Sequence, residues 1–339
     1  MGNLLSHPIE EKVLETISHE HLTYSIGSMQ GYRMTMEDEY NIKVNEDESL
    51  SIFGVFDGHG GKEIAEIVSD KLIDVLFKEL NELVKDETTT LKEYMTCVKD
   101  VFFGVDNELP HQPSLNCGTT AIVNIIIHKK YIISANTGDS RSIMSLDGGN
   151  CKTLSFDHKP SNMGERVRIE NSGGYVINGR VNEILALSRA FGDFKFKIPF
   201  IELKANNNTF LEKNKRFFKN DLIHLPPELF QVSSEPDLLI YDLQQLKQPE
   251  FIILACDGIW DCYRNDDLIR LIRDKLVLDW SLQNIIEFIL NDCISMASNI
   301  TGIGFDNMTI IIIAVHDNSN IDDWYDMMKT KILKEKNLE

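Results

Sequence analysis

The chain has 339 residues and lacks any apolar run long enough to cross a bilayer. Two of its longer apolar stretches, 251–256 and 310–315, are far shorter than the roughly 18 to 20 residues that a spanning helix requires. Basic side chains are also scarce, because 34 Lys and Arg face 53 Asp and Glu, which gives a formal charge of −19. Nucleic-acid binding depends on clustered Lys and Arg, so this acidity argues against a DNA or RNA partner.

Features of a secreted protein are missing as well. Residues 1–20 contain four glutamates and no apolar core, so they do not form a secretory signal. The six cysteines form no CxxC pair and no dense disulfide framework for a chain of this length. We therefore expect reduced thiols and a cytoplasmic or nuclear protein.

The first six residues, MGNLLS, fit the pattern for myristoylation of Gly2 after removal of the initiator methionine. An unmodified terminus explains the same residues equally well. A single acyl chain gives only weak, reversible membrane contact. We therefore expect at most peripheral membrane association, and only if Gly2 is acylated.

The composition, 42% hydrophobic and 26% charged, is typical of a folded globule. Apolar periodicity predicts strands at 50–56, 251–256 and 308–315, and helices at 61–83, 91–109, 268–278 and 282–297. Three more β-like runs, 119–127, 131–135 and 140–146, are separated by short polar turns and predict an antiparallel meander. Because strands and helices occur in blocks, we favour an α+β fold of face-to-face sheets with helix pairs outside over a doubly wound parallel sheet.

Residues 195–219 differ from the rest of the chain, because seven basic side chains face only two acidic ones. The segment contains three consecutive asparagines and precedes Pro226-Pro227, which predicts an exposed insertion. Such a loop could dock acidic regions of partner proteins on an otherwise repelling surface. A solvated loop without a binding role explains the same composition.

Four aspartates stand at the ends of apolar β runs: Asp57, Asp139, Asp257 and Asp306. Taken singly, each could merely form an Asx turn or cap a helix. Anions gathered at buried strand ends are costly unless a cation compensates their charge. We therefore expect one shared cation site. Three further acidic residues are candidate ligands: Glu37, Asp38 and Asp261.

The candidate ligands are all oxygen donors, and no His or Cys occurs at zinc spacing. Such a set favours hard ions such as Mg²⁺ or Mn²⁺ over zinc. Two such ions about 4 Å apart can make a shared water more acidic and hold a phosphate oxygen. Hydrolysis of a phosphate ester is therefore the reaction class that these residues indicate.

Residues 57–61 read DGHGG, and the glycines permit a tight turn in which the Gly58 carbonyl could coordinate metal. His59 would stand just before a long helix, where it could donate a proton to a leaving oxygen. The helix N-terminus disfavours the imidazolium, whereas nearby carboxylates favour it, and the sequence leaves this balance open. Arg33 offers a planar fork for two phosphate oxygens.

Seven segments resemble the motifs of the metal-dependent (type 2C, PPM) serine/threonine protein phosphatases. They occur in the family's order: GYRMTMED at 31–38, VFDGHGG at 55–61, GTTA at 118–121, GDSR at 138–141, SRAFGD at 188–193, CDGIWD at 256–261 and DNMT at 306–309. The likeness covers about residues 22–316. A match to seven motifs in the family's order is far more specific for the family than a match to any one motif.

The resemblance implies an αββα sandwich, in which two mainly antiparallel sheets are flanked by helix pairs and a flap lies beside the active site. It implies a single phosphatase domain over 21–320, with the flap and the basic insertion at about 162–230. Residues 1–20 would be an N-terminal segment and residues 321–339 a C-terminal tail. The basic insertion is longer than the family's compact connection, so the family's flap geometry is not carried over there.

The resemblance also implies the metal ligands. Asp57 would bridge two Mg²⁺ or Mn²⁺ ions, and Gly58 would contribute its carbonyl to one of them. Asp257 and Asp306 would ligate the other ion. Four more acidic residues match positions around this pair, Glu37 and Asp38 acting partly through water and Asp139 and Asp261 at a weaker third ion.

The implied activity is hydrolysis of phosphoserine and phosphothreonine in proteins by a monomeric enzyme. A metal-bridging hydroxide would attack phosphorus directly, without a phosphoenzyme. Arg33 matches the arginine that holds the phosphate, and His59 matches the general acid that protonates the leaving oxygen.

Two other classes of function also fit clustered aspartates. A two-metal phosphodiesterase or nuclease would use them in the same way, although the charge of −19 and the motif order argue against it. An acidic interaction protein would use them only to hold structural ions. The presence of Arg33 and His59 beside the presumed ions weakens that interpretation.

Overall fold

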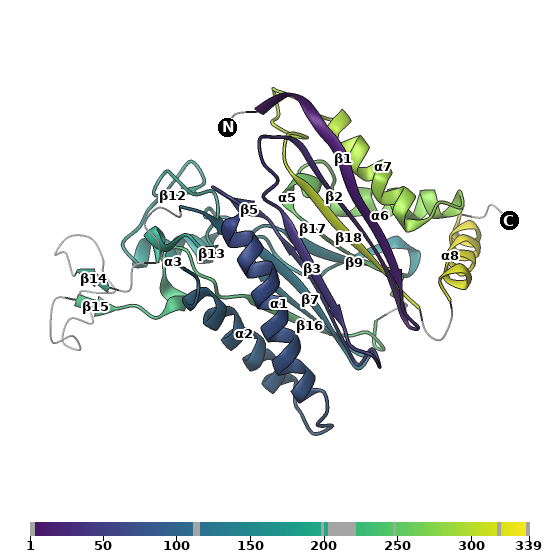
Figure 1. The fold of residues 1–339 in the computed structure, drawn as a ribbon, viewed down its shortest axis with the longest axis horizontal. Helices are drawn as coiled ribbons and strands as arrows, with labels where there is room; N and C mark the ends of the chain where they lie inside the picture. Colours follow the sequence, from purple (N-terminus) through teal and green to yellow (C-terminus); the bar gives the residue numbers. More distant parts are fainter. Residues whose placement is uncertain are drawn as a thin grey trace.

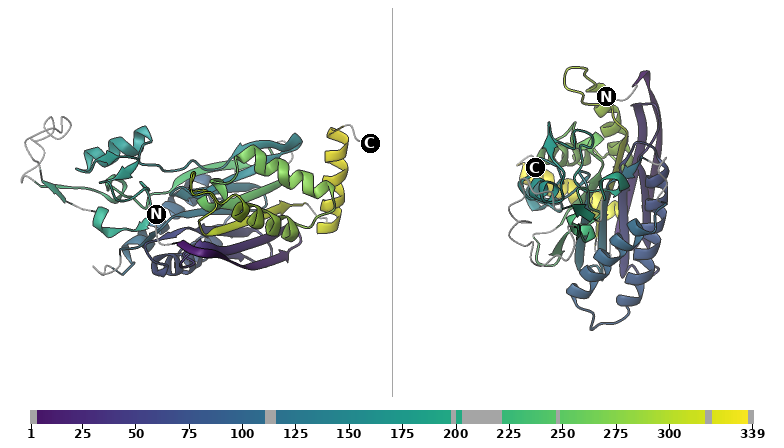
Figure 2. Two further views of the ribbon diagram at one scale, coloured as in Figure 1. Left: turned by 90° about the horizontal axis from the view of Figure 1, so that it is seen from above. Right: turned by 90° about the vertical axis from the view of Figure 1, so that its left-hand side faces the viewer.

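The computed structural model describes residues 4–110, 116–197, 200–202, 222–246, 249–316 and 320–336. Two antiparallel sheets pack face to face, and helices cover their outer faces (Figures 1 and 2). This arrangement confirms the expected α+β class and the αββα sandwich.

The first large sheet has six strands in the order β1-β2-β18-β17-β9-β10. Their bounds are β1 Leu4–Ser18, β2 Leu22–Arg33, β18 Met308–Val315, β17 Phe251–Ala255, β9 Arg141–Leu146 and β10 Asn150–Thr153. Helix α7 (Leu282–Ser295) packs across β1 and β2, and α6 (Asn265–Val277) lies beside β10 and α8 (Ile321–Glu335). This layer is therefore closed from outside by the C-terminal helices.

The second large sheet has five strands in the order β16-β8-β7-β4-β3. Their bounds are β16 Asp237–Asp242, β8 Tyr131–Thr137, β7 Ala121–Ile127, β4 Leu50–Phe56 and β3 Glu39–Val44. Helix α1 (Glu63–Leu83) packs on β3 and β4, and α2 (Leu91–Asn107) packs on α1. Figure 1 shows these two helices along the outer side of this sheet.

Short elements connect these layers. The small strands are β5 Gly58–His59, β6 Gly118–Thr119, β11 Val176–Ile177, β12 Arg180–Val181, β13 Phe191–Gly192, β14 Phe200–Glu202 and β15 Leu222–His224. The short helices are α3 Met163–Asn171, α5 Asp257–Trp260 and three 3₁₀ turns at 147–149, 194–196 and 227–229. In Figure 1, α3, β12, β14 and β15 project from one end of the sandwich.

The core follows from the apolar periodicity. Every residue of β4 is buried because one face of its sheet packs on the other sheet and the other face packs on α1. Helix α1 buries residues at spacings of three and four, including Val68, Leu72 and Leu76, and these fill the layer between α1 and its sheet. The predicted strand at 50–56 and helix at 61–83 are thus confirmed.

The predicted meander of three strands is wrong for its third member. Strands β7 and β8 pair in the five-stranded sheet, but β9 pairs with β17 and β10 in the other sheet. The chain crosses between the layers at 138–140, where Gly138 has a φ of +119° that favours glycine. Short turns alone do not reveal such a crossing.

Residues 4–18 and 321–335, near the two ends of the chain, form regular secondary structure. Leu4–Ser18, placed within an N-terminal segment, forms β1 and pairs along β2. Residues 321–335, placed within a C-terminal tail, form α8, whose Trp324, Met328 and Ile332 are buried. The sequence holds two local signals for α8. Asn320 caps the helix by accepting a hydrogen bond from the Asp323 amide, and apolar residues recur along the helix.

Some predicted features lie outside the described residues. These include Gly2 and most of the basic segment 195–219, namely 198–199 and 203–219. Within the described part of the chain, none of the helices combines the length and the apolar character needed to cross a membrane.

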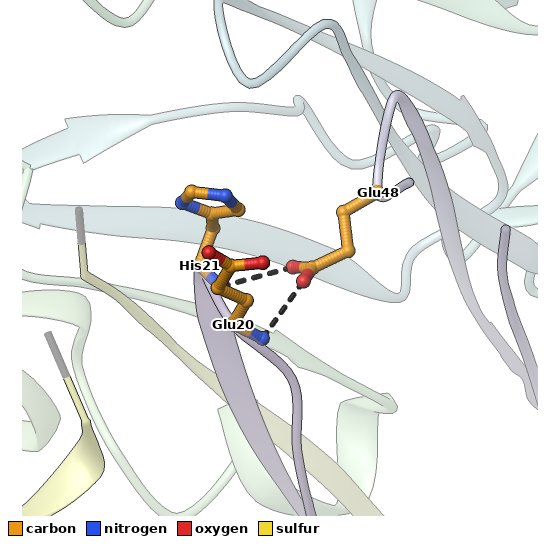
Figure 3. Close-up of side chains that lie close together, drawn as sticks. All are labelled: Glu20, His21 and Glu48. Atoms are coloured by element: carbon orange, nitrogen blue, oxygen red, sulfur yellow. Dashed lines mark hydrogen bonds between the residues drawn. The ribbon is translucent and has the colours of Figure 1, made fainter. Parts of the chain in front are cut away.

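Glu48 joins the β1–β2 turn to the β3–β4 turn (Figure 3). Its buried carboxylate accepts hydrogen bonds from the backbone amides of Glu20 at 2.7 Å and His21 at 3.1 Å. The carboxylate thereby adds a polar connection between the two sheets, which also pack through apolar side chains such as Tyr24 and Phe53. Partly buried amides that lose their acceptor cost free energy, so this carboxylate should matter for stability.

We expect Glu48→Ala to lower the free energy of unfolding by about 1 to 3 kcal/mol, because two amides lose their acceptor. Urea denaturation would measure the change. Glu46→Ala, an exposed glutamate of the same turn, is the matched control and should change stability by less than about 0.5 kcal/mol. Equal stability of the Glu48 variant and the wild type would show that the turns are held by other contacts.

Candidate active site

A pocket of 410 Å³ opens where β4, β8 and β17 end and β18 begins. We call it the acidic pocket. Its lining includes most of the predicted site residues: Arg33, Glu37, Asp57, Gly58, His59, Asp139, Asp257 and Asp306. The structure thus brings together side chains that lie more than 270 residues apart in the sequence.

Backbone packing around Asp57 explains the DGHGG turn. The Gly58 amide donates to the Glu37 carbonyl at 3.2 Å, and a Cβ on Gly58 would lie 2.3 Å from that oxygen. The Asp57 amide donates to Thr120 Oγ1 at 3.1 Å. Only glycine allows the two segments to approach so closely, so Asp57 is fixed between β4 and the Glu37 segment.

A similar close approach holds Asp257 beside Asp306. A Cβ on Gly258 would lie 2.0 Å from the Asn307 carbonyl oxygen. The side chain of Asn307 accepts a hydrogen bond from the Glu37 amide at 3.0 Å and donates to the Thr35 carbonyl at 3.1 Å. The first turn of α5, the start of β18 and the Glu37 segment are therefore held in one arrangement.

Two predicted residues lie outside the pocket lining. Asp38 is buried beneath it, where its carboxylate accepts a hydrogen bond from the Thr309 hydroxyl at 2.8 Å. Asp261 follows α5 and its amide donates to the Asp257 carbonyl at 2.7 Å. Burial raises the pKa of Asp261, whereas the charge of Lys159 opposes the rise.

The carboxylates of the acidic pocket are buried close together and repel one another. Burial raises the pKa of Asp57 and of Asp257 well above the usual value, and neighbouring carboxylates raise both further. Burial and the charge of Asp306 raise the pKa of Asp38 to about 7. The protein alone therefore does not stabilise all of these groups as anions.

The residues present fit a hard divalent cation. Asp38, Asp57 and the Cys256 thiol bring possible ligand atoms within 4.8 Å of one another, a group that does not include Asp257 or Asp306. The pocket otherwise offers carboxylates and carbonyls, which are the donors that Mg²⁺ and Mn²⁺ prefer. Bound cations would relieve the repulsion that raises the pKa values of these carboxyls.

Asp193 is a site residue that the sequence analysis missed. His59 Nε2 lies 2.6 Å from Asp193 Oδ2, and Asp193 is buried. Burial alone would lower the pKa of His59, but the charge and hydrogen bond of Asp193 outweigh it, so the pKa is raised. The sequence left open whether His59 is charged, and the raised pKa favours the imidazolium. Asp193 ends the SRAFGD motif, but nothing in the spacing connects it to His59.

Two cations partly neutralise the pocket. Arg33 Nη2 lies 2.6 Å from Asp306 Oδ2, and the Arg33 side chain remains 44% exposed, so part of its fork faces solvent. Lys159, which the sequence analysis did not single out, forms an ion pair with Asp139. Burial would lower the pKa of Lys159, but the charge of Asp139 raises it overall.

The flap forms one wall of the pocket through Arg180 and residues 185–187. Its helix α3 is held by Glu165, which pairs with Arg168 and Arg189. Although burial would raise the pKa of Glu165, the Arg189 hydrogen bond and the two arginine charges lower it to about 2. Arg189 also pairs with Asp237 on β16 at 2.9 Å, which connects the flap to the sandwich.

One member of the basic segment is not exposed, contrary to the prediction. Lys197 is buried and its ammonium donates to Asp106 at 2.6 and 2.7 Å and to the Ala190 carbonyl at 2.9 Å. This lysine therefore anchors the chain to α2, and the positive charge left for docking is smaller than the composition indicates.

Comparisons with known proteins agree with this geometry. A family model described as protein phosphatase 2C matches residues 22–301. Protein phosphatase 2C homolog 4 of Saccharomyces cerevisiae is 36% identical over 403 residues, covering 100% of both chains. Protein phosphatase 2C homolog 2 of Schizosaccharomyces pombe is 35% identical over 342 residues, covering 98% of this chain and 83% of that protein.

Solved structures show the same fold. A crystal structure of serine-threonine phosphatase 2C from Toxoplasma gondii superposes with a TM-score of 0.68 at 21% identity, covering 90% of this chain and 99% of that chain. At this identity the likeness concerns the fold alone. Together with the match to the family model and to the yeast proteins, it leads to one conclusion: the chain belongs to the protein phosphatase 2C family.

Proposed function

We propose that the protein is a Mg²⁺- or Mn²⁺-dependent phosphatase that hydrolyses phosphoserine and phosphothreonine in proteins. The observation that supports this most directly is the convergence of Asp57, Asp257 and Asp306 with Arg33 and His59 on one pocket. Phosphoryl transfer depends mainly on positioning and charge neutralisation, and these residue types supply both.

Two ions would be held by Asp57, the Gly58 carbonyl, Asp257 and Asp306, with Glu37 and Asp38 close by. A weaker third ion would lie at Asp139 and Asp261. When bound, such ions supply positive charge for phosphate oxygens and make a bound water more acidic.

Arg33 binds the phosphate in this proposal. Its guanidinium is held at one side by Asp306, and its remaining donors are free to contact two phosphate oxygens. The pairing with Asp306 keeps the fork at the pocket mouth without burying it, so no large rearrangement is required before a phosphate enters.

His59 provides the proton for the leaving oxygen. Asp193 accepts the Nε2 proton of the imidazolium, whereas Nδ1 has no hydrogen-bond partner among the described residues. Nδ1 is also buried, so transfer of its proton to the leaving oxygen requires the ring to turn when substrate binds. Asp193 acts as a positioning residue, because it orients the ring and maintains its charge.

We expect release of phosphate from a phosphothreonine peptide in the presence of Mn²⁺, and loss of that release when a chelator removes the ion. A phosphodiester offered under the same conditions should not be cleaved. Cleavage of the diester with the peptide left intact would favour a phosphodiesterase. No hydrolysis of either substrate would favour an acidic interaction protein.

We expect His59→Ala to slow hydrolysis of a phosphoserine peptide by roughly 10²-fold or more, because an alkoxide leaves poorly without a proton. Hydrolysis of p-nitrophenyl phosphate should fall far less, since its leaving group needs no proton. Steady-state kinetics on both substrates would measure the ratio. His7→Ala, at an exposed histidine of β1, is the control. Equal losses on the two substrates would remove His59 from this role.

We expect Asp57→Asn to abolish both tight Mn²⁺ binding and turnover, because Asp57 would be a ligand of the proposed ions. Isothermal titration calorimetry would measure the binding directly, and Asp100→Asn on the exposed face of α2 is the control. Two tight Mn²⁺ sites in the Asp57 variant would contradict the ligand assignment.

A further inference from the structure

Two cysteines come together behind the acidic pocket. Cys262 lies in the turn that follows α5, and Cys293 lies in the last turn of α7. The Cys262 sulfur is 3.9 Å from the backbone oxygen of Cys293. Cys293 is buried, whereas Cys262 is partly exposed, so one thiol of the pair is accessible to a reagent in solvent.

Further contacts hold the two thiols beside each other. Helix α5, which ends just before Cys262, is in contact with α7, which carries Cys293. The neighbouring Tyr263 hydroxyl donates to the Asp292 carboxylate, so the residues that adjoin the two cysteines are also joined. A disulfide needs close sulfurs and a short separation of the backbones, and both segments are held in contact here.

The thiol pair is directly connected to the pocket. Cys262 follows Asp261, one turn beyond Asp257. On the other side, the loop that leads to Asp306 packs against Cys293: Gly304 has a φ of +77°, and a Cβ there would lie 2.6 Å from the Cys293 carbonyl oxygen. A change in the separation of the two cysteines would therefore move the segments that carry Asp257 and Asp306.

We propose that Cys262 and Cys293 form a reversible disulfide under oxidising conditions and that this bond lowers the activity of the enzyme. The bond itself is independent of the proposed phosphatase activity, whereas its effect on turnover rests on that function. Because cytosolic thiols are mostly reduced, the disulfide would act as a transient signal rather than a structural bond.

The chemistry requires a peroxide as oxidant. The Cys262 sulfur attacks one oxygen of hydrogen peroxide, the O–O bond breaks, and a sulfenic acid and one water form. The Cys293 sulfur then attacks the Cys262 sulfur, the S–O bond breaks, and the disulfide and a second water are produced. Two thiols are oxidised and one peroxide is reduced. A dithiol such as dithiothreitol reverses the change.

Cys256, which lies closest to the pocket, is not expected to react in this way. It is fully buried, so an oxidant in solvent does not reach its sulfur. Its sulfur also accepts a hydrogen bond from the Thr309 amide at 3.1 Å. The partly exposed Cys262 is the better entry point for an oxidant.

The test is oxidation of the full chain with hydrogen peroxide, followed by alkylation, digestion and mass spectrometry. We expect a peptide pair joined through Cys262 and Cys293. Release of phosphate from a phosphothreonine peptide should fall by roughly tenfold or more, because small displacements of positioning groups have large kinetic effects. Dithiothreitol should restore it.

Variants separate this pair from other oxidised residues. The single variants Cys262→Ser and Cys293→Ala should each keep their phosphatase activity after treatment with peroxide. Cys97→Ser and Cys151→Ser, at partly exposed cysteines on α2 and β10, should be inactivated like the wild type.

Two results would overturn the proposal: absence of the joined peptide, or equal inactivation of the Cys262 variant and the wild type. A joined peptide in a protein that has no phosphatase activity before oxidation would support the disulfide and reject the proposed function instead.

Discussion

Mutual repulsion among buried carboxylates is the constraint on which the rest of this structure depends. Asp38, Asp57 and Asp257 all have raised pKa values, chiefly because they are buried, and each is raised further by its neighbours. Left to themselves, such groups would separate or take up protons. The surrounding sandwich holds them together through apolar strands that are fully buried, such as β4, and through backbone contacts that admit only glycine, such as those at Gly58 and Gly258. The pocket is therefore pre-formed for cations.

The acidic site was predictable because it is encoded locally. An apolar run that ends in an aspartate gives both the strand and its terminal anion, so β4 with Asp57 and β17 with Asp257 follow from short stretches of sequence. What could not be predicted depends on partners distant in the chain. Strand β9 joins the opposite sheet because it pairs with β17, which begins 105 residues after the last residue of β9. The partner of His59 is Asp193, 134 residues away.

The burial of Lys197 explains why composition alone wrongly predicted that this part of the basic segment is exposed. Lysine and arginine are usually solvated, so a run of them predicts an exposed loop. Lys197 instead finds a buried carboxylate, Asp106, with nearly ideal hydrogen-bond distances. A buried charge is tolerated only when it is paired in this way. The identity of the partner depends on how α2 packs, and this is a property of the tertiary structure rather than of residues 195–219.

The distribution of cations also indicates an order of affinity among the proposed ion sites. Asp139 already pairs with Lys159, so an ion at Asp139 and Asp261 would have to compete with an ammonium group that is held in place. Among the described residues Asp57 forms no ion pair, and the charges that raise its pKa are carboxylates. A divalent ion would therefore gain more free energy at Asp57 than at Asp139, because it would remove uncompensated repulsion at the first proposed site and displace an existing ion pair at the second. The same lysine that stabilises the pocket without metal would thus make the third ion the weakest.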